Sequence, residues 1–434
     1  MIPTGQETFP TAPEGTAMRV LELARAGQFA QLRDLFTEGL RPMVTAAALQ
    51  AAWETALAEH GPVSTVGVPV SEPVAGDMVA VKVPLAFERG ALTLAVYLSG
   101  AGQLTGLQLE PAANAEPAAP WQPPSYADPD RFDEHDVTLG SGPLAVPGTL
   151  SLPRAAGPHP ALLLLGGSGP VDRDGTILRS RPLKDLAWGL ASQGVAVLRF
   201  DKVTYAHPDQ VGANRAFTVA DEYLPDALAG LGLLRNHPAI DAARVFAAGH
   251  SLSGTVAPRV AAADPAVAGL VILAGGTEPL AWAAVRQVRY LASLDPASAA
   301  AAQPGIDAMT AQAMRVDAPD LSPETPDHEL PFGVPAAYWL DLRGYDPVAV
   351  AAGLGRPMLI LQGGRDYQVT VADDLSRWQA GLGPKPGVTI GVYPPDNHFF
   401  FPGAGQSSPA ELATAQHVDP DVIADIHHWL TADR

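Results

Sequence analysis

Short runs of apolar residues alternate with helix-forming stretches from about residue 160 to the C-terminus. Six runs have the length of a single strand: residues 161–165, 195–200, 245–248, 268–274, 357–361 and 388–393. Helical patterns separate or follow them, at residues 184–193, 221–236 and 422–430 and from residue 253 onward. Strands that are apolar along their whole length are buried on both faces, and connecting helices leave them parallel. The sequence therefore predicts an α/β fold with a doubly wound, mostly parallel sheet, which opens with a hairpin formed by residues 137–139 and 150–152.

The alternation stops between residues 276 and 356. This stretch is rich in alanine and has scattered prolines, for example at residues 297–302 and 319–335. An insertion at this point of a doubly wound sheet is expected to form a helical cap over the strand ends. Four aromatic residues of the insertion are candidates for the wall of an apolar pocket: Trp282, Tyr290, Trp339 and Tyr345.

A proline-rich stretch at residues 111–131 separates this region from the first 110 residues and is expected to be a linker. The first 110 residues contain helical patterns at 21–36 and 46–59, followed by four strand-like runs: residues 63–70, 78–87, 92–98 and 103–109. This order predicts a small α+β domain with an antiparallel sheet. Its one histidine, His60, lies at a helix end and is expected to cap or to be solvated. The predicted domains are residues 1–110 and 132–434.

Composition excludes several classes of function. The 434 residues include no cysteine, which excludes disulfides, thiolate metal sites and a catalytic thiol. A net charge of −19 would repel phosphate backbones and anionic lipid surfaces, so neither nucleic acid nor membrane is expected as a partner. No apolar run approaches the roughly 18 residues of a membrane-spanning helix, and no targeting segment stands out. We expect a soluble, cytoplasmic protein.

Ser251 is the candidate nucleophile. Residues 245–254 read as a strand, a sharp turn at Gly249-His250-Ser251, and a helix. Such a turn holds the serine backbone in a strained conformation and exposes its hydroxyl, the arrangement known as a nucleophile elbow. The alternative is an ordinary loop in which the serine caps the helix.

The candidate base and acid follow Ser251 in chain order. His398 lies in a loop just after the run at 388–393, and Asp366 follows the run at 357–361 through a glycine turn. An ionised carboxylate there would hold the imidazole in the tautomer that accepts the serine proton. The main rival acid is Glu278. The other downstream histidines are expected in surface, packing or cap positions: His328, His417, His427 and His428.

The candidate oxyanion hole consists of two backbone N–H groups. One belongs to Leu252, directly after the nucleophile, and the other to the glycine-rich loop that contains Ser168. A phosphate-binding loop is the alternative, but no Gly-Lys-Ser/Thr follows it. The segment 172–175, Asp-Arg-Asp-Gly, matches only part of a calcium loop and is expected to be a structural turn. No metal site and no cofactor are expected.

In this order the motifs resemble those of the α/β-hydrolase superfamily, specifically bacterial esterases with a DUF3887-like N-terminal accessory domain. The resemblance covers about residues 130–434, and residues 1–110 more loosely. Its motifs lie at residues 167–175, 199–202, 249–254, 364–366 and 397–398. The resemblance implies that Ser251, Asp366 and His398 form a catalytic triad and that the amides of Ser168 and Leu252 form the oxyanion hole.

Two positions depart from the family pattern. Gly166 replaces a histidine that often precedes the oxyanion glycine, and Ser253 stands where the family usually has glycine. The accessory domain is expected either to form a homodimer or to cover the active site. The expected reaction is hydrolysis of small to medium acyl esters. A peptidase or a thioesterase on the same triad, or a non-catalytic binding protein, stays open as an alternative.

Overall fold

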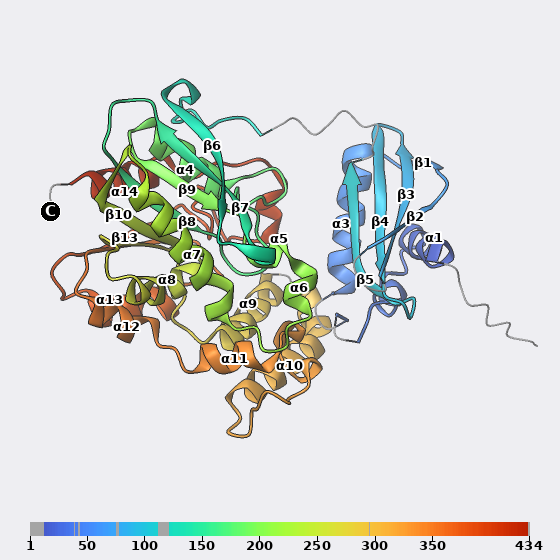
Figure 1. The fold of residues 1–434 in the computed structure, drawn as a ribbon. Coiled ribbons are helices and arrows are strands. Elements are labelled where there is room, and N and C mark those ends of the chain that lie inside the picture. Colours follow the sequence, from blue (N-terminus) through green and yellow to red (C-terminus); the bar gives the residue numbers. More distant parts are fainter. Residues whose placement is uncertain are drawn as a thin grey trace, which may run out of the picture. The chain divides into compact units, whose positions relative to one another are not determined.

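The computed structural model describes residues 13–38, 40–41, 44–74, 78–111, 121–294 and 296–432. The chain divides into two compact units (Figure 1). One contains the described residues up to 111 together with the stretch 292–311, and the other contains residues 121–291 and 312–432.

The first unit packs helices against an antiparallel sheet. Its helices are α1 (Pro13–Arg25), α2 (Phe29–Arg33) and α3 (Ala46–His60). Its strands are β1 (Val63–Val66), β2 (Val70–Pro73), β3 (Val79–Phe87), β4 (Gly90–Leu98) and β5 (Leu104–Pro111). The sheet order is β1-β3-β4-β5, and β2 also pairs with β3. Alternate residues of β3, among them Val81, Val83 and Leu85, are buried with the apolar faces of α1 and α2.

The second unit is built on an eight-stranded sheet. Its strands are β6 (Phe132–Leu139), β7 (Val146–Pro153), β8 (His159–Leu165), β9 (Ala196–Phe200), β10 (Ile240–His250), β11 (Leu270–Leu273), β12 (Met358–Gly363) and β13 (Val388–Tyr393). The order is β13-β12-β11-β10-β8-β9-β7-β6, and the strands from β13 to β9 are parallel. The hairpin β6–β7 joins β9 in antiparallel pairing. The predicted mostly parallel sheet is confirmed.

Helices cover both faces of this sheet (Figure 1). One layer contains α7 (Val219–Asn236), α8 (Leu252–Ala263), α12 (Pro347–Leu354) and α13 (Ser376–Leu382), and the other contains α4 (Pro182–Ser192) and α14 (Pro420–Thr431). In β8, Leu163 and Leu165 face the first layer, whereas Leu162 and Leu164 face the second. A strand must be apolar at every position when both of its faces are covered, which is why β8 has no alternation.

The strand order reverses between β8 and its two neighbours, since β9 lies on one side and β10 on the other. In open α/β sheets, ligands bind outside the carboxyl ends of the strands at such a reversal. The loops after β8 and β10, which contain Ser168 and Ser251, therefore meet at the position where a binding site is expected.

Five further helices lie between β11 and β12 or between β9 and α7. They are α9 (Leu280–Leu294), α10 (Pro296–Asp317) and α11 (Ala336–Arg343) after β11, with α5 (Val203–Ala206) after β9; α6 (Pro208–Gly212) continues α5. Residues 292–311, predicted as part of the insertion in the second domain, group with the first unit. The sequence pattern predicts helices here but does not show which unit they join.

Two other features of the structure differ from what the sequence predicts. Residues 121–131, predicted as linker, belong to the second unit, because Trp121 Nε1 donates to Asp185 Oδ1 (3.2 Å) and the amide of Asp128 donates to Ser192 Oγ (2.8 Å). Helix α13 was not predicted, since its buried side chains, Trp378 and Leu382, are too few for a clear period.

Residues 112–120 of the predicted linker and residues 1–12, where a targeting segment would start, lie outside the described residues. No helix among those described is long and apolar enough to cross a membrane.

The two-sided burial of β8 gives a test of the fold. Leu163 is fully buried in the centre of the sheet, so Leu163→Ala is expected to lower the free energy of unfolding by about 2–5 kcal/mol through lost burial and a residual cavity. Leu144→Ala, at a leucine that is 42% exposed, is the matched control and should change it by less than about 0.5 kcal/mol. Urea unfolding measures both values, and equal values for the two variants would contradict this packing.

Candidate active site

Ser251 lies in a sharp turn between β10 and α8. Its backbone has φ 60° and ψ −124°, a conformation that is rare for a residue with a side chain. Leu252 is the first residue of α8, so its N–H has no acceptor within the helix. The strand, strained serine and helix match the geometry of a nucleophile elbow.

Small residues make this turn sterically feasible. A Cβ atom on Gly249 would lie 2.2 Å from the Ser253 carbonyl oxygen, and one on Gly254 would lie 2.9 Å from Gly275 Cα. Any side chain at either position would therefore push α8 away from the sheet. The strand and the helix meet closely because both positions are glycine.

Ser253, the departure from the family pattern, fits the turn without strain. Its side chain is fully buried; the hydroxyl accepts from the amide of His250 (2.8 Å) and lies 2.9 Å from the carbonyl oxygens of both Leu165 and His250. The hydroxyl thus ties the elbow to the end of β8, a link that glycine would not provide.

His398 and Asp366 are in contact. His398 Nδ1 lies 2.7 Å from Asp366 Oδ2, and both residues are buried. The carboxylate also accepts from Gln362 Nε2 (2.9 Å) and from the amides of Gln368 (2.8 Å) and Val369 (2.9 Å). These three further donors fix the orientation of the carboxylate. Nδ1 of His398 therefore carries its proton, which leaves Nε2 as the atom able to accept one.

His250 packs against His398 and is hydrogen-bonded to its backbone. Its Nε2 donates to the backbone carbonyl of His398 (2.8 Å), and the centroids of the two rings are 4.8 Å apart. Burial, together with the neighbouring His398, lowers the pKa of His250 to about 3. His250 is thus a neutral ring with a fixed tautomer that connects the serine turn to the histidine loop.

The loop after β8 is held by a buried lysine. Lys202 Nζ lies 2.6 Å from the carbonyl oxygen of Gly167 and 2.8 Å from that of Gly169, on either side of Ser168. Its charge is balanced by Glu222, whose Oε1 is 2.7 Å away. Burial lowers the pKa of Lys202, while Glu222 opposes this shift. These contacts fix the backbone of the loop on both sides of Ser168.

The segment 172–175 is structural. Arg173 makes a two-pronged ion pair with Asp201 (3.0 Å), and Asp174 accepts from Arg199 Nε (3.0 Å). These pairs join the loop after β8 to the end of β9. Among the described residues, no group of three or more His, Asp or Glu side chains is arranged to hold a metal ion.

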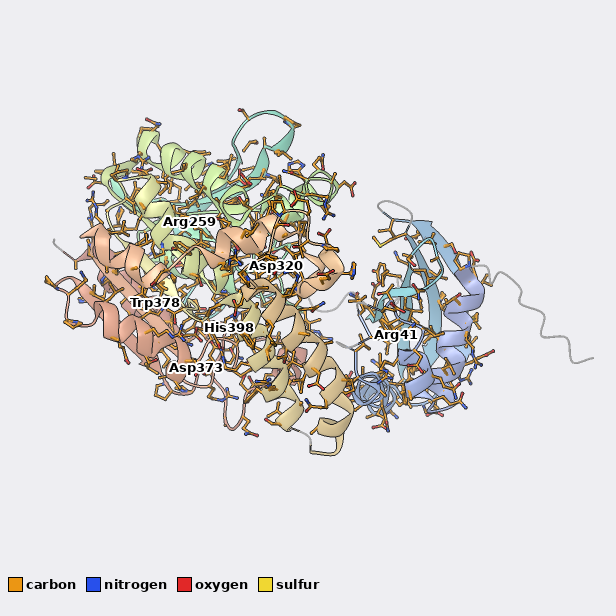
Figure 2. All side chains as sticks on the ribbon, turned by 90° about the horizontal axis from the view of Figure 1, so that it is seen from below. Arg41, Arg259, Asp320, Asp373, Trp378 and His398 are labelled. Carbon is orange, nitrogen blue, oxygen red and sulfur yellow. The ribbon has the colours of Figure 1, made fainter. Side chains whose placement is uncertain are left out.

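Ser251 lies where two cavities meet. The smaller has a volume of about 190 Å³ and is also lined by Gly167, Ser168 and His398. The larger has a volume of about 840 Å³ and is also lined by Ser168 and Leu252. The structure therefore brings together the five predicted site residues, with Asp366 behind His398. Figure 2 shows His398 among the side chains of the second unit.

The remaining candidates lie elsewhere. Glu278, the rival acid, forms an ion pair with Arg286 (2.7 Å) and lines only the larger cavity. His417 contacts Asp185, and His427 contacts the Gln193 carbonyl, so both are packing residues.

Two of the four predicted pocket aromatics line the larger cavity. Trp339 and Tyr345 do so, whereas Trp282 instead donates to Asp317 (2.7 Å) and Tyr290 to the Ser407 carbonyl (2.8 Å).

Sequence reasoning assigned no role to Lys202, Glu222, His250 or Gln362. Lys202 and His250 lie inside motifs, next to Asp201 and Ser251. This position is the only sequence feature that points to a role for them. Glu222 is a helix residue, and Gln362 is the one polar side chain in the otherwise apolar strand β12.

Comparison with known proteins identifies the class. The chain is 35% identical to Esterase EstD of Thermotoga maritima over 346 residues, which span 80% of this chain and 78% of that protein. The chain belongs to this family of α/β-hydrolase esterases and is a carboxylesterase-type hydrolase. No family model matches the chain, so the DUF3887-like character of residues 1–110 stays a prediction.

Solved structures that the chain matches include Est1E from Butyrivibrio proteoclasticus, with a TM-score of 0.45 and 15% identity over 69% of this chain and 99% of that one. The 2,6-dihydroxy-pseudo-oxynicotine hydrolase matches with a TM-score of 0.39 and 18% identity over 62% of each chain.

The low pKa of His250 predicts a pH dependence of stability. The folded protein keeps this ring neutral, whereas the unfolded chain binds a proton below about pH 6.5, so stability falls as the pH falls. Between pH 7.5 and 5, the wild type should lose about 2 kcal/mol more of its unfolding free energy than His250→Gln does. Urea unfolding at both pH values measures this, with the exposed His428→Gln as control. Identical losses in the wild type and His250→Gln would contradict the neutral ring.

The Lys202–Glu222 pair predicts separable effects on stability and on ester hydrolysis. Lys202→Met leaves the Glu222 carboxylate buried without its cation and should cost about 3–5 kcal/mol of unfolding free energy. Adding Glu222→Gln removes that charge and should restore most of the stability. The kcat should stay at least about tenfold below wild type in the double variant, because the ammonium group that bridges the two carbonyls is still missing and the Tyr223 and Thr204 hydroxyls each reach only one of them. Recovery of kcat together with stability would show that Lys202 does not position the loop.

Proposed function

We propose that this esterase hydrolyses carboxylic esters of small to medium acyl chain through a covalent acyl-enzyme on Ser251, with His398 as base and Asp366 as its orienting acid. The observation that carries the proposal is the 2.7 Å contact between Asp366 and His398 beside a cavity that is shared with a strained Ser251. The substrate is a small-molecule ester.

The first half-reaction follows from these positions. His398 Nε2 takes the proton of Ser251 Oγ, and the oxygen bonds to the ester carbonyl carbon. The negative charge that develops on the carbonyl oxygen is stabilised by the amides of Leu252 and Ser168. Each such donor is worth about 3–4 kcal/mol of transition-state stabilisation. The charged imidazole, held by Asp366, then returns its proton to the alkoxide oxygen as the C–O bond breaks and the alcohol leaves.

The second half-reaction releases the acid. Water gives its proton to His398 Nε2 and attacks the acyl carbon, and the same two amides stabilise the second tetrahedral intermediate. His398 then protonates Ser251 Oγ as the carboxylic acid leaves. No other group has to change its protonation state. This agrees with the neutral ring of His250 and with the Asp366 carboxylate, which accepts hydrogen bonds from Gln362 and from the amide of Gln368.

Substitution of the nucleophile tests this proposal. Ser251→Ala should lower kcat for p-nitrophenyl acetate and butyrate by about 10³-fold or more, because the acyl-enzyme no longer forms. Asp366→Asn should lower it by about 10³–10⁴-fold, since the amide favours the wrong imidazole tautomer. Asp136→Asn, at a side chain that is 95% exposed, is the matched control and should retain wild-type kcat.

Circular dichroism establishes that each variant is folded. Equal activity of Ser251→Ala and wild type would remove Ser251 from the mechanism. Inactivity of the wild type on these esters, with Ser251-dependent cleavage of aminoacyl anilides or acyl-CoA, would instead favour a peptidase or a thioesterase.

A further inference from the structure

The two cavities that meet at Ser251 differ in size and in chemistry. They share Ser168, Pro170, Ser251 and Gln368, so the nucleophile and the Ser168 loop lie at their junction. At about 840 Å³, the larger falls within the roughly 300–1,000 Å³ range of sites that enclose a drug-sized ligand. At about 190 Å³, the smaller has less than a quarter of that volume.

His398 lines the smaller cavity and not the larger one. It is joined there by His250 and Phe399, with Ile177 and Leu183 on the wall that the loop after β8 and the start of α4 provide. The ring centroids of His398 and Phe399 are 5.1 Å apart, so the imidazole is braced within this cavity.

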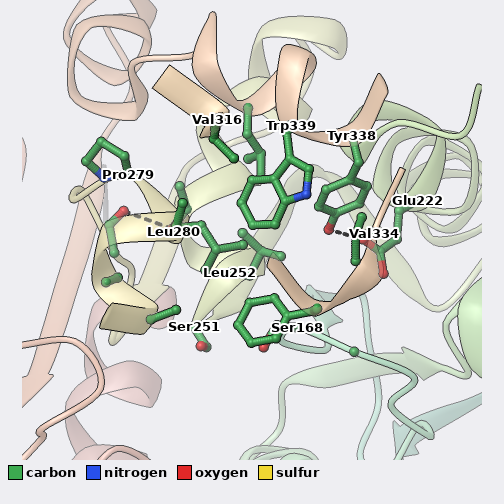
Figure 3. A pocket seen from close by; sticks show the side chains of 18 of the residues that line it. Ser168, Glu222, Ser251, Leu252, Pro279, Leu280, Val316, Val334, Tyr338 and Trp339 are labelled. Atoms are coloured by element: carbon green, nitrogen blue, oxygen red, sulfur yellow. Dashed lines mark hydrogen bonds between the residues drawn. The ribbon is translucent and has the colours of Figure 1, made fainter. Parts of the chain in front are cut away.

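The larger cavity is mainly apolar. Its wall includes Leu252, Leu280, Val316, Val334 and Trp339, which Figure 3 shows together with Ser251 and Ser168. Glu222 also lines it, but both carboxylate oxygens are engaged, one by Tyr338 Oη (2.6 Å) and the other by Lys202 (2.7 Å). Glu222 therefore offers no free acceptor to a ligand. The other charged residues that line the cavity also have partners: Glu278 and Asp374 pair with Arg286, Asp327 pairs with Arg215, Asp317 accepts from Trp282, and Arg343 donates to the carbonyls of Val316 and Ala318. The cavity therefore suits a hydrocarbon chain.

From this arrangement we infer that the smaller cavity receives the alcohol part of the ester and the larger cavity receives the acyl chain. The inference rests on the proposed acyl-enzyme mechanism. His398 must protonate the leaving oxygen, so this oxygen has to lie within hydrogen-bond reach of Nε2, on the side of Ser251 where His398 is found. The acyl carbon is bonded to Ser251, and its chain extends to the other side.

The volumes then define the substrate class. The enzyme prefers esters that carry the longer chain on the acid over isomers that carry it on the alcohol, because the larger cavity has more than four times the volume of the smaller. Within the proposed range of small to medium acyl chains, the longer ones are preferred, and long-chain alcohols are rejected.

A pair of isomeric esters tests the assignment directly. Ethyl octanoate and octyl acetate have the same atoms and differ only in which side of the ester carries the long chain. The kcat/KM for ethyl octanoate should exceed that for octyl acetate by at least about tenfold, measured by acid release at constant pH. An equal or reversed ratio overturns the assignment. Ser251→Ala is run in parallel: if it loses both activities, the mechanism stands whatever the ratio, and if it keeps them, the proposed function itself fails.

Matched variants locate the selectivity in the two cavities. Val316→Phe fills part of the larger cavity, so the kcat/KM for ethyl octanoate relative to that for ethyl acetate should fall at least about fivefold. Met314→Phe is the control, because Met314 lies on the same helix and is 61% exposed; it should leave this ratio unchanged. Ile177→Ala enlarges the smaller cavity and should raise the ratio of octyl acetate to ethyl octanoate, with Leu178→Ala, at a neighbour that is 71% exposed, as control.

Val316 is buried, so Val316→Phe can fail to fold. In that case Ile177→Ala, at a half-buried loop residue, tests which cavity receives the alcohol. A ratio that does not change in Ile177→Ala, or that changes equally in Leu178→Ala, overturns the assignment of the alcohol to the smaller cavity.

Discussion

The site depends on how closely β10 and α8 approach at the serine turn. Gly249 lies so near the Ser253 backbone that any Cβ atom would collide with it, and Ser251 takes a positive φ as a result of the turn. This strain is sustained because β10 is paired on both sides and α8 is buried against the sheet, so the surrounding packing leaves no alternative path for the chain. The same packing sets Ser251 at the reversal of strand order, where the loop after β8 meets it.

Buried polar contacts hold the parts of the site in fixed positions relative to one another. Ser253 joins the turn to the end of β8, His250 joins it to the backbone of His398, and Lys202 fixes the loop that contains Ser168. Each of these groups is buried and satisfied, and in a low dielectric such contacts tolerate little displacement. In the proposed mechanism, this rigidity keeps the nucleophile, the base and the two amides in place before the substrate arrives, so no reorganisation is needed as charge develops.

The parts of the fold that could be predicted are those with a local signal. Continuous apolar runs predicted β8 to β13, and the chain order of Ser251, Asp366 and His398 selected three residues that the structure brings together; their roles stay predictions. Lys202 and His250 lie within the motifs at residues 199–202 and 249–254, but their roles have no local signal, because their contacts reach Gly167 and His398, 35 and 148 residues away. Helix α13 and the grouping of residues 292–311 were missed for the same reason, since tertiary packing decides both. The division of the site into two cavities depends on side chains from many loops and has no sequence signature.

The central claim is that Ser251 attacks the substrate and is acylated. An alkyl p-nitrophenyl phosphonate, which replaces the carbonyl carbon by phosphorus and forms a stable bond with an activated serine, tests this most directly. Mass spectrometry of the treated protein should show one phosphonyl group per chain, located by peptide mapping at Ser251, with complete loss of esterase activity and no label in Ser251→Ala. A label at another residue that accounts for the inactivation, or full ester hydrolysis by Ser251→Ala, would contradict the account.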